Sequence, residues 1–207
     1  MKTLIQYGTV YDGSGNAPRQ ADVLIEGDRI TAVGQALPAD GAHVIHARGR
    51  CVTPGFIDIH RHCDIAALTS PDFGETELAQ GITTTVGGNC GLAAVPVNPA
   101  YSKAMYDYIE PVLGPIPAGM RFATHADYAN ALTRARLPIN MGFLVASGAV
   151  RTAVKGFAKT PYTAAELDQA TAMVDEGMQA GARGISFGIM YQPECWSTQE
   201  ELVAIAK

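Results

Sequence analysis

The first part of the chain alternates short apolar runs with turn residues. Stretches rich in β-branched and aromatic side chains are separated by Gly and Asp, and Gly27-Asp28 stands at a tight turn between two of them. This pattern predicts short strands joined by hairpins. We therefore expect a small antiparallel β module over residues 1–52, in which His43 and His46 face solvent or cap a strand rather than bind a ligand.

Beyond residue 52 the apolar pattern alternates between strand-like and helix-like stretches. Helix starts are indicated at Thr163-x-x-Glu166, which has the spacing of a capping box, and at Ser197-x-x-Glu200. A stretch rich in Pro, Gly and Tyr, from about Val95 to Gly119, indicates a long insertion. The expected strands are VTPGFIDIH, ITTTVGGNCG, INMGFLVASG and ARGISFGIMY, and the expected helices are FGETELAQG, THADYANALTRARL and the segments that follow Thr163 and Ser197.

Strands that alternate with helices through long crossovers indicate an α/β fold, in which helices cover a parallel sheet. Four such units fit either an open doubly wound sheet or half of an eight-stranded barrel. A complete barrel of that kind needs about 250 residues, and residues 53–207 provide fewer. If the fold is a TIM-like (β/α)8 barrel, residues 53–207 are only its first half.

The composition argues against several classes of protein. The chain has 47% hydrophobic and 17% charged residues, as globular proteins do, and its net charge of -5 is scattered. Without a basic stripe, nucleic acid is not an expected partner. No apolar run reaches the roughly 18 residues of a membrane span, and the N-terminus turns polar too soon for a secretory signal, so we expect a cytoplasmic protein without membrane contact.

The candidate chemistry begins in the segment FIDIHRHCD, which closes the first strand of the α/β part. Because side chains alternate along a strand, Asp58, His60 and His62 are expected on one face, with Ile57 and Ile59 on the other. Two imidazoles one residue apart can bind a single divalent metal, and parallel sheets place their sites at the carboxyl ends of the strands. The alternative is a pair of polar residues that merely ends a strand.

Three segments resemble the N-acyl-D-amino-acid deacylases, or D-aminoacylases, of the metal-dependent amidohydrolase superfamily. They are PGFIDIHRHCD, ITTTVGGNCG and GARGISFGIMYQPECWSTQEELVAIAK. The resemblance implies a β module followed by a (β/α)8 barrel, with Cys90 as a zinc ligand at the end of the second strand. It also implies that His60 and His62 serve a second, weaker metal position. The two other zinc-binding histidines and the general-base Asp of the family have no match here, so the chain corresponds to the N-terminal half.

The activity that this resemblance implies is hydrolysis of the amide bond of N-acyl-D-amino acids by zinc-activated water. The sequence departs from the family at Ser147, where a histidine is common, but retains Arg151. Arg151 is a candidate for the substrate carboxylate, although a structural salt bridge is the favoured alternative. Ser186 and Tyr191 are candidates to line the substrate pocket, with a packing role as an equally open alternative for Tyr191.

Other interpretations stay open at this stage. The chain could belong to an amidohydrolase that acts on a cyclic amide, or it could be a truncated remnant without catalysis. The fourth predicted strand contains no lysine, which argues against a site bridged by a carboxylated lysine. His125, ahead of a helix, is expected to be a cap neighbour or a surface residue. The acyl group, the preferred side chain and the oligomeric state are not indicated.

Overall fold

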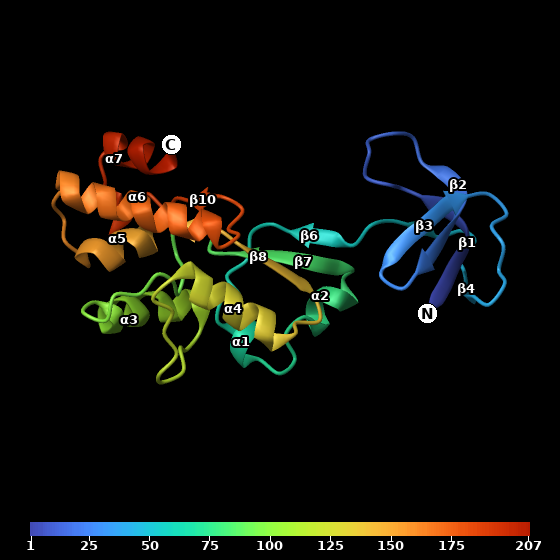
Figure 1. Cartoon of the computed structure of the whole chain (residues 1–207), viewed down its shortest axis with the longest axis horizontal. Helices are drawn as coiled ribbons and strands as arrows, with labels where there is room; N and C mark the ends of the chain where they lie inside the picture. The colour runs from blue at the N-terminus through green and yellow to red at the C-terminus, as the bar shows by residue number, and fades with distance from the viewer. The chain divides into compact units, whose positions relative to one another are not determined.

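The computed structural model describes residues 1–207, which divide into two compact units, Met1–Gly55 and Phe56–Lys207. The first unit consists of strands and the second mixes strands with helices (Figure 1). The strands of the first unit are β1 (Lys2–Val10), β2 (Arg19–Glu26), β3 (Arg29–Gly34), β4 (His43–His46) and β5 (Cys51–Val52).

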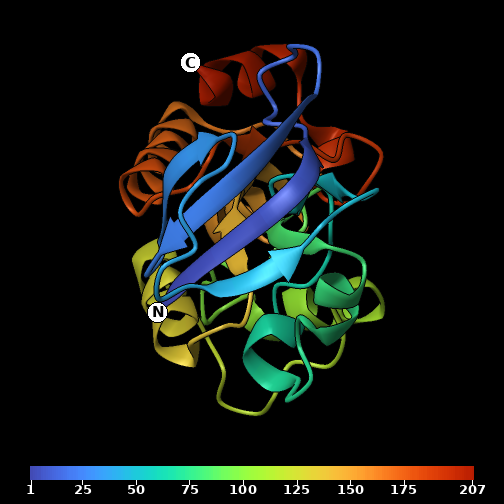
Figure 2. The ribbon, with the colours of Figure 1, turned by 90° about the vertical axis from the view of Figure 1, so that its right-hand side faces the viewer.

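The sheet of the first unit has the order β3-β2-β1-β4, and β5 also pairs with β1. The expected hairpins are present, because β1, β2 and β3 pair antiparallel and Gly27 occupies the tight turn with a φ of 66°. The prediction of a wholly antiparallel module is wrong for β4 and β5, which pair parallel to β1. After β3 the chain crosses to the other side of β1, and Figure 2 shows the light-blue β4 beside the dark-blue β1.

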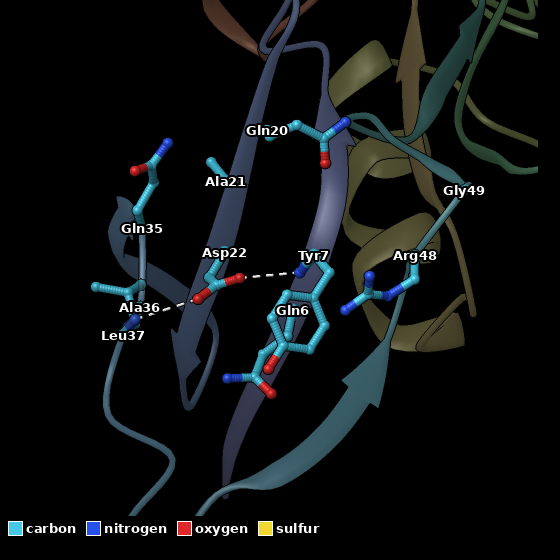
Figure 3. A pocket seen from close by; sticks show the side chains of 10 residues that line it. All are labelled: Gln6, Tyr7, Gln20, Ala21, Asp22, Gln35, Ala36, Leu37, Arg48 and Gly49. Carbon is cyan, nitrogen blue, oxygen red and sulfur yellow. Dashed lines mark hydrogen bonds between the residues drawn. The ribbon is translucent and has the colours of Figure 1, made fainter.

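A β-bulge in β1 shapes an open pocket in the first unit. The register shifts between Ile5 and Gly8, and Tyr7 takes a φ of 63°. The buried carboxylate of Asp22 accepts hydrogen bonds from the backbone N–H groups of Tyr7, at 2.9 Å, and Leu37, at 3.1 Å (Figure 3). These bonds hold the bulge and the segment after β3 to the middle of the sheet.

The second unit contains parallel strands that follow one another in chain order. One sheet has the order β6-β7-β8, and the other pairs β9 with β10. Only Leu144 separates β8 from β9, so one run of chain pairs first with β7 and then with β10. The strands are β6 (Phe56–Asp58), β7 (Ile82–Gly87), β8 (Asn140–Phe143), β9 (Val145–Ala146) and β10 (Ile185–Ser186).

Seven α-helices connect and flank these strands (Figure 1). Their apolar faces pack with the strands into two clusters, and Val145, a member of the larger cluster, is fully buried. None of the helices combines the length and the apolar character that crossing a bilayer demands. The helices are α1 (Ala66–Thr69), α2 (Glu75–Ala79), α3 (Ser102–Leu113), α4 (His125–Ala135), α5 (Ser147–Lys155), α6 (Ala164–Gln179) and α7 (Gln199–Ala206).

The expected α/β alternation is confirmed, but some boundaries differ. The capping box at Thr163 and Glu166 is confirmed at the start of α6. The box of α7 lies one residue later than predicted, because the hydroxyl of Thr198 accepts the N–H of Glu201. Three helices were not expected from the sequence, namely the short α1, α3 within the insertion and α5 directly after β9.

Candidate metal centre

The two histidines of the first motif lie in a loop just after β6. The strand ends at Asp58, whose side chain accepts a hydrogen bond from the backbone N–H of His60 at 3.1 Å. The His60 and His62 rings are 5.8 Å apart in an edge-to-face arrangement. The expected strand therefore ends before the two histidines, which lie in a loop that the hydrogen bond between Asp58 and His60 stabilises.

Cys90 lies in a tight turn just beyond β7. Its φ is 59° and that of Gly91 is 68°, and the N–H of Leu92 donates to the carbonyl of Asn89 at 2.9 Å. Positive φ at both central residues is the pattern of a type I′ turn, which strongly favours Gly, Asn or Asp at these positions. Because cysteine has a Cβ, this backbone conformation is strained at Cys90. The turn directs the thiol of Cys90 toward the histidine loop.

The thiol and the two imidazoles form a compact cluster. Nε2 of His60 lies 3.2 Å from Sγ of Cys90. The potential ligand atoms of His60, His62 and Cys90 all lie within 4.8 Å of one another. His60 is exposed and the other two side chains are half-buried, so the cluster faces solvent on one side.

The residues of the cluster fit a zinc ion. Nitrogen and sulfur are the ligand atoms that Zn²⁺ prefers. Nδ1 of His62 is buried without a hydrogen-bond partner, which is costly for a polar atom unless a ligand occupies it. Burial, together with the neighbouring His60, lowers the pKa of His62 and so favours the neutral imidazole that binds metal.

Arg61, between the two histidines, ties their loop to its surroundings. The guanidinium of Arg61 pairs with the buried carboxylate of Glu77 on α2. The backbone N–H of Arg61 donates to the carbonyl of Val86 at 3.3 Å. The side-chain amide of Asn89 donates to the carbonyl of Val86, at 2.8 Å, and to that of Arg61, at 3.4 Å. The histidine loop and the Cys90 turn are thus linked through Asn89.

Asp64 stabilises the backbone that leads into the Cys90 turn. Its buried carboxylate accepts the N–H of Gly88 at 2.9 Å, and its second oxygen has no partner. Burial raises the pKa of Asp64 to about 7. The hydroxyl of Tyr128 donates to the backbone carbonyl of Asp64 at 3.1 Å, which anchors the segment around Asp64 to α4.

Ser186 lies against the Cys90 turn and not in an open pocket. Its hydroxyl donates to the carbonyl of Gly88 and accepts the N–H of Gly91 at 3.0 Å. Tyr191 is 44% exposed in the loop after β10. A role for either residue in substrate binding stays a prediction.

Arg151 is held in the interior of the unit. Its guanidinium donates to Glu201 at 3.3 Å and to the carbonyl of Thr160 at 2.8 Å, and it lies 4.6 Å above the ring of Tyr162. Only 1% of its surface is exposed. The salt bridge named as the alternative for Arg151 is therefore present, and its binding of a substrate carboxylate stays a prediction.

Buried polar residues that carry no motif complete the surroundings. Glu194 accepts hydrogen bonds from Ser147, at the position of the common family histidine, and from the N–H of Gly188. Sequence reasoning missed Glu194 and Glu77, because a buried carboxylate leaves no local pattern. The expectation that His125 could lie at the surface is wrong: it follows the cap residue of α4, but it is fully buried, and its Nδ1 contacts Glu176 at 2.8 Å.

Comparison with known proteins identifies the family of the chain. Residues 43–204 match the model of the amidohydrolase family. The N-acyl-D-aspartate deacylase of Alcaligenes xylosoxydans xylosoxydans is 37% identical over 204 residues, which are 99% of this chain and 40% of that enzyme. The chain thus spans about 40% of the length of this curated relative.

Solved structures give the same assignment. The N-acyl-D-glutamate deacylase of Bordetella bronchiseptica, in complex with zinc and a phosphonate that mimics the tetrahedral intermediate, is 33% identical with a TM-score of 0.85, over 99% of this chain and 42% of that one. A D-aminoacylase described as having a binuclear metal center is 34% identical with a TM-score of 0.82, over the same shares. The resemblance seen in the motifs is confirmed, and the chain belongs to the amidohydrolase family.

Proposed function

We propose that the whole protein hydrolyses the amide bond of N-acyl-D-amino acids, with zinc held in part by this chain. The observation that carries this proposal is the cluster of His60, His62 and Cys90 just beyond two neighbouring parallel strands. The likeness to the deacylases supports it. In this proposal residues 1–52 belong to the β module, and residues 53–207 form the first half of a (β/α)8 barrel.

The residues of the chain have distinct parts in this proposal. Cys90 holds the tightly bound zinc, and His60 and His62 hold a second, weaker metal position. Bound zinc lowers the pKa of a coordinated water toward about 7 and polarises a carbonyl oxygen. Asn89 and Arg61 hold the two ligand loops together, because the side-chain amide of Asn89 donates to the backbone carbonyls of Arg61 and Val86. We place the general-base Asp and the remaining ligands in a part of the protein that these residues do not include.

The substrate side rests on fewer contacts. Tyr191 is exposed beyond β10 and is the candidate to line the pocket, whereas Arg151 would have to exchange Glu201 for a substrate carboxylate. We propose a small-molecule N-acyl-amino-acid substrate and a cytoplasmic location, with neither nucleic acid nor membrane as a partner. A cyclic-amide substrate is the second candidate, but the segment around β10 lacks the lysine that would bridge two metals.

The experiment measures zinc and activity in the full-length protein. We expect about one tightly held zinc, lost in Cys90→Ala, and release of free amino acid from N-acetyl-D-aspartate or N-acetyl-D-glutamate. Cys195→Ala is the matched control, since Cys195 is also a free thiol but lies outside the cluster. Protein without zinc after metal-supplemented expression would contradict the proposal, and hydrolysis of dihydrouracil alone would select the cyclic-amide candidate.

A further inference from the structure

We propose that Ser186 is a positioning residue that holds the Cys90 turn in its metal-binding shape. This inference rests on the proposed function, because it assumes that Cys90 binds a metal. It assigns Ser186 a different part from the substrate contact expected from the sequence. The residue lies at the end of β10, about a hundred residues along the chain from the turn that it contacts.

The turn needs support because its backbone is strained. Cys90 adopts a φ of 59°, which is unfavourable for a residue with a Cβ. Such conformations persist only where surrounding contacts determine them, and they collect at functional sites. A relaxed turn would move the thiol away from His60, whose Nε2 it now approaches at 3.2 Å.

The Ser186 hydroxyl bridges the two residues that flank Asn89-Cys90. It donates to the carbonyl of Gly88 on one side and accepts the N–H of Gly91 on the other. Both groups are buried, so neither has water as a substitute partner. One side chain therefore fixes both ends of the strained segment.

Neighbouring packing leaves the turn little room to shift. A Cβ on Gly188 would overlap the carbonyl of Cys90, and one on Gly88 would overlap the carbonyl of Leu144. The Gly188 backbone is itself held, because its N–H donates to the buried carboxylate of Glu194 at 2.7 Å. Ser186 thus acts within a rigid frame, where its hydroxyl supplies the only side-chain hydrogen bond to Gly91.

Direct contact with substrate is a poor alternative for Ser186. Only 9% of the residue is exposed. A serine hydroxyl has a single proton to donate, and this proton is directed at Gly88. A substrate group would have to displace that bond and thereby release the turn.

The test titrates the purified, metal-free full-length protein with Cd²⁺ and follows thiolate-to-metal charge-transfer absorption. We expect Ser186→Ala to weaken Cd²⁺ binding about 10- to 100-fold, the range for residues that orient metal ligands. Ser186→Thr keeps the hydroxyl and should restore most of the affinity. Ser102→Ala is the matched control, since it removes another buried serine hydroxyl, which donates to the Pro99 carbonyl away from the turn.

The outcomes separate this inference from the proposed function. If the wild-type protein gives the charge-transfer band and Ser186→Ala binds Cd²⁺ as tightly, the positioning role is wrong and the proposed function stands. A Ser186→Ala protein that is only less heat-stable, with unchanged affinity, also overturns it. Wild-type protein without the band, or with the same band in Cys90→Ala, overturns both.

A second measurement needs no variant to fold. The N–H of Gly91 should exchange slowly with solvent deuterium in the wild-type protein, because it donates to a buried hydroxyl. Exchange at the rate of an open loop would show that the bridge does not hold the turn, and would overturn the inference.

Discussion

At the scale of single residues, most polar groups around the metal centre are determined by one or two partners. Asn89 links the two ligand loops, Asp64 and Ser186 hold the Cys90 turn, and Glu77 holds Arg61. His125 shows the same principle outside the centre. It is buried at the start of α4 and hydrogen-bonds Glu176 from α6, so this pair joins two helices.

The His125–Glu176 pair should make stability depend on pH. Burial lowers the pKa of His125, although Glu176 partly offsets it. For Glu176 burial raises the pKa, but the hydrogen bonds from His125 and Ala126 outweigh it and the net pKa is lowered. Below the unfolded pKa of about 6.5 the unfolded histidine binds a proton more readily than the folded one, so acidification lowers stability. Protonation of Glu176 removes further stability as pH falls through its lowered folded pKa.

The measurement compares unfolding free energies at pH 7 and pH 5.5 in the full-length protein. Wild-type stability should fall by at most about 1.4 kcal/mol per pH unit for this one proton, and His125→Gln should reduce that slope. His43→Gln, which replaces an exposed histidine of the first unit, is the control. If the unfolding free energy of His125→Gln depended on pH as steeply as that of the wild-type protein, the pH dependence could not be assigned to the His125–Glu176 pair.

At the scale of helices and strands, the sequence predicted the features that depend on contacts between residues close together in the chain. The start of α6 follows from its capping box, and α4 from its apolar spacing. The early helix α5 could not be foreseen, because it begins at Ser147-Gly148 with no loop after β9. Its position depends on a distant contact, since the N–H of Ala149 donates to the Gly91 carbonyl at 3.2 Å.

The same distinction applies to the candidate site. His60, His62 and Cys90 stand in short recognisable motifs, so the sequence indicated them as ligands. The part of Ser186 depends on hydrogen bonds across more than ninety residues, which no spacing along the chain expresses. The hydrogen bond that Glu194 accepts from Ser147 likewise joins residues 47 apart in the chain, so it can be recognised only in the folded structure.

The shifted cap of α7 gives a matched pair of variants. The Thr198 hydroxyl accepts the N–H of Glu201, and the Glu201 carboxylate accepts the N–H of Thr198 at 2.8 Å. Thr198→Ala should lower the unfolding free energy by about 1 kcal/mol, as the loss of an N-cap does. Ser197→Ala, at the position that the sequence suggested, should have little effect. If denaturant unfolding showed a larger loss of unfolding free energy for Ser197→Ala than for Thr198→Ala, that result would contradict the structure.

At the scale of the whole molecule, β6 leaves an apolar edge open. It pairs only with β7, and Phe56, Ile57 and Ile59 are 58%, 62% and 72% exposed. Parallel sheets normally have both faces covered, and an uncovered apolar edge strand is a site for association. The proposed half-barrel accounts for this edge, because the last strand of a closed barrel would pair with the first.

We therefore expect the 207-residue chain, expressed alone, to associate in solution. A charge on an edge strand opposes pairing with another chain, so Ile57→Lys should shift the protein toward the monomer in light scattering. Ile30→Lys is the matched control, since Ile30 is 66% exposed on β3 of the other unit. A monomeric wild-type chain with one sharp thermal transition would show that the β6 edge needs no cover. Equal effects of the two lysines would show that net charge, and not the β6 edge, controls association.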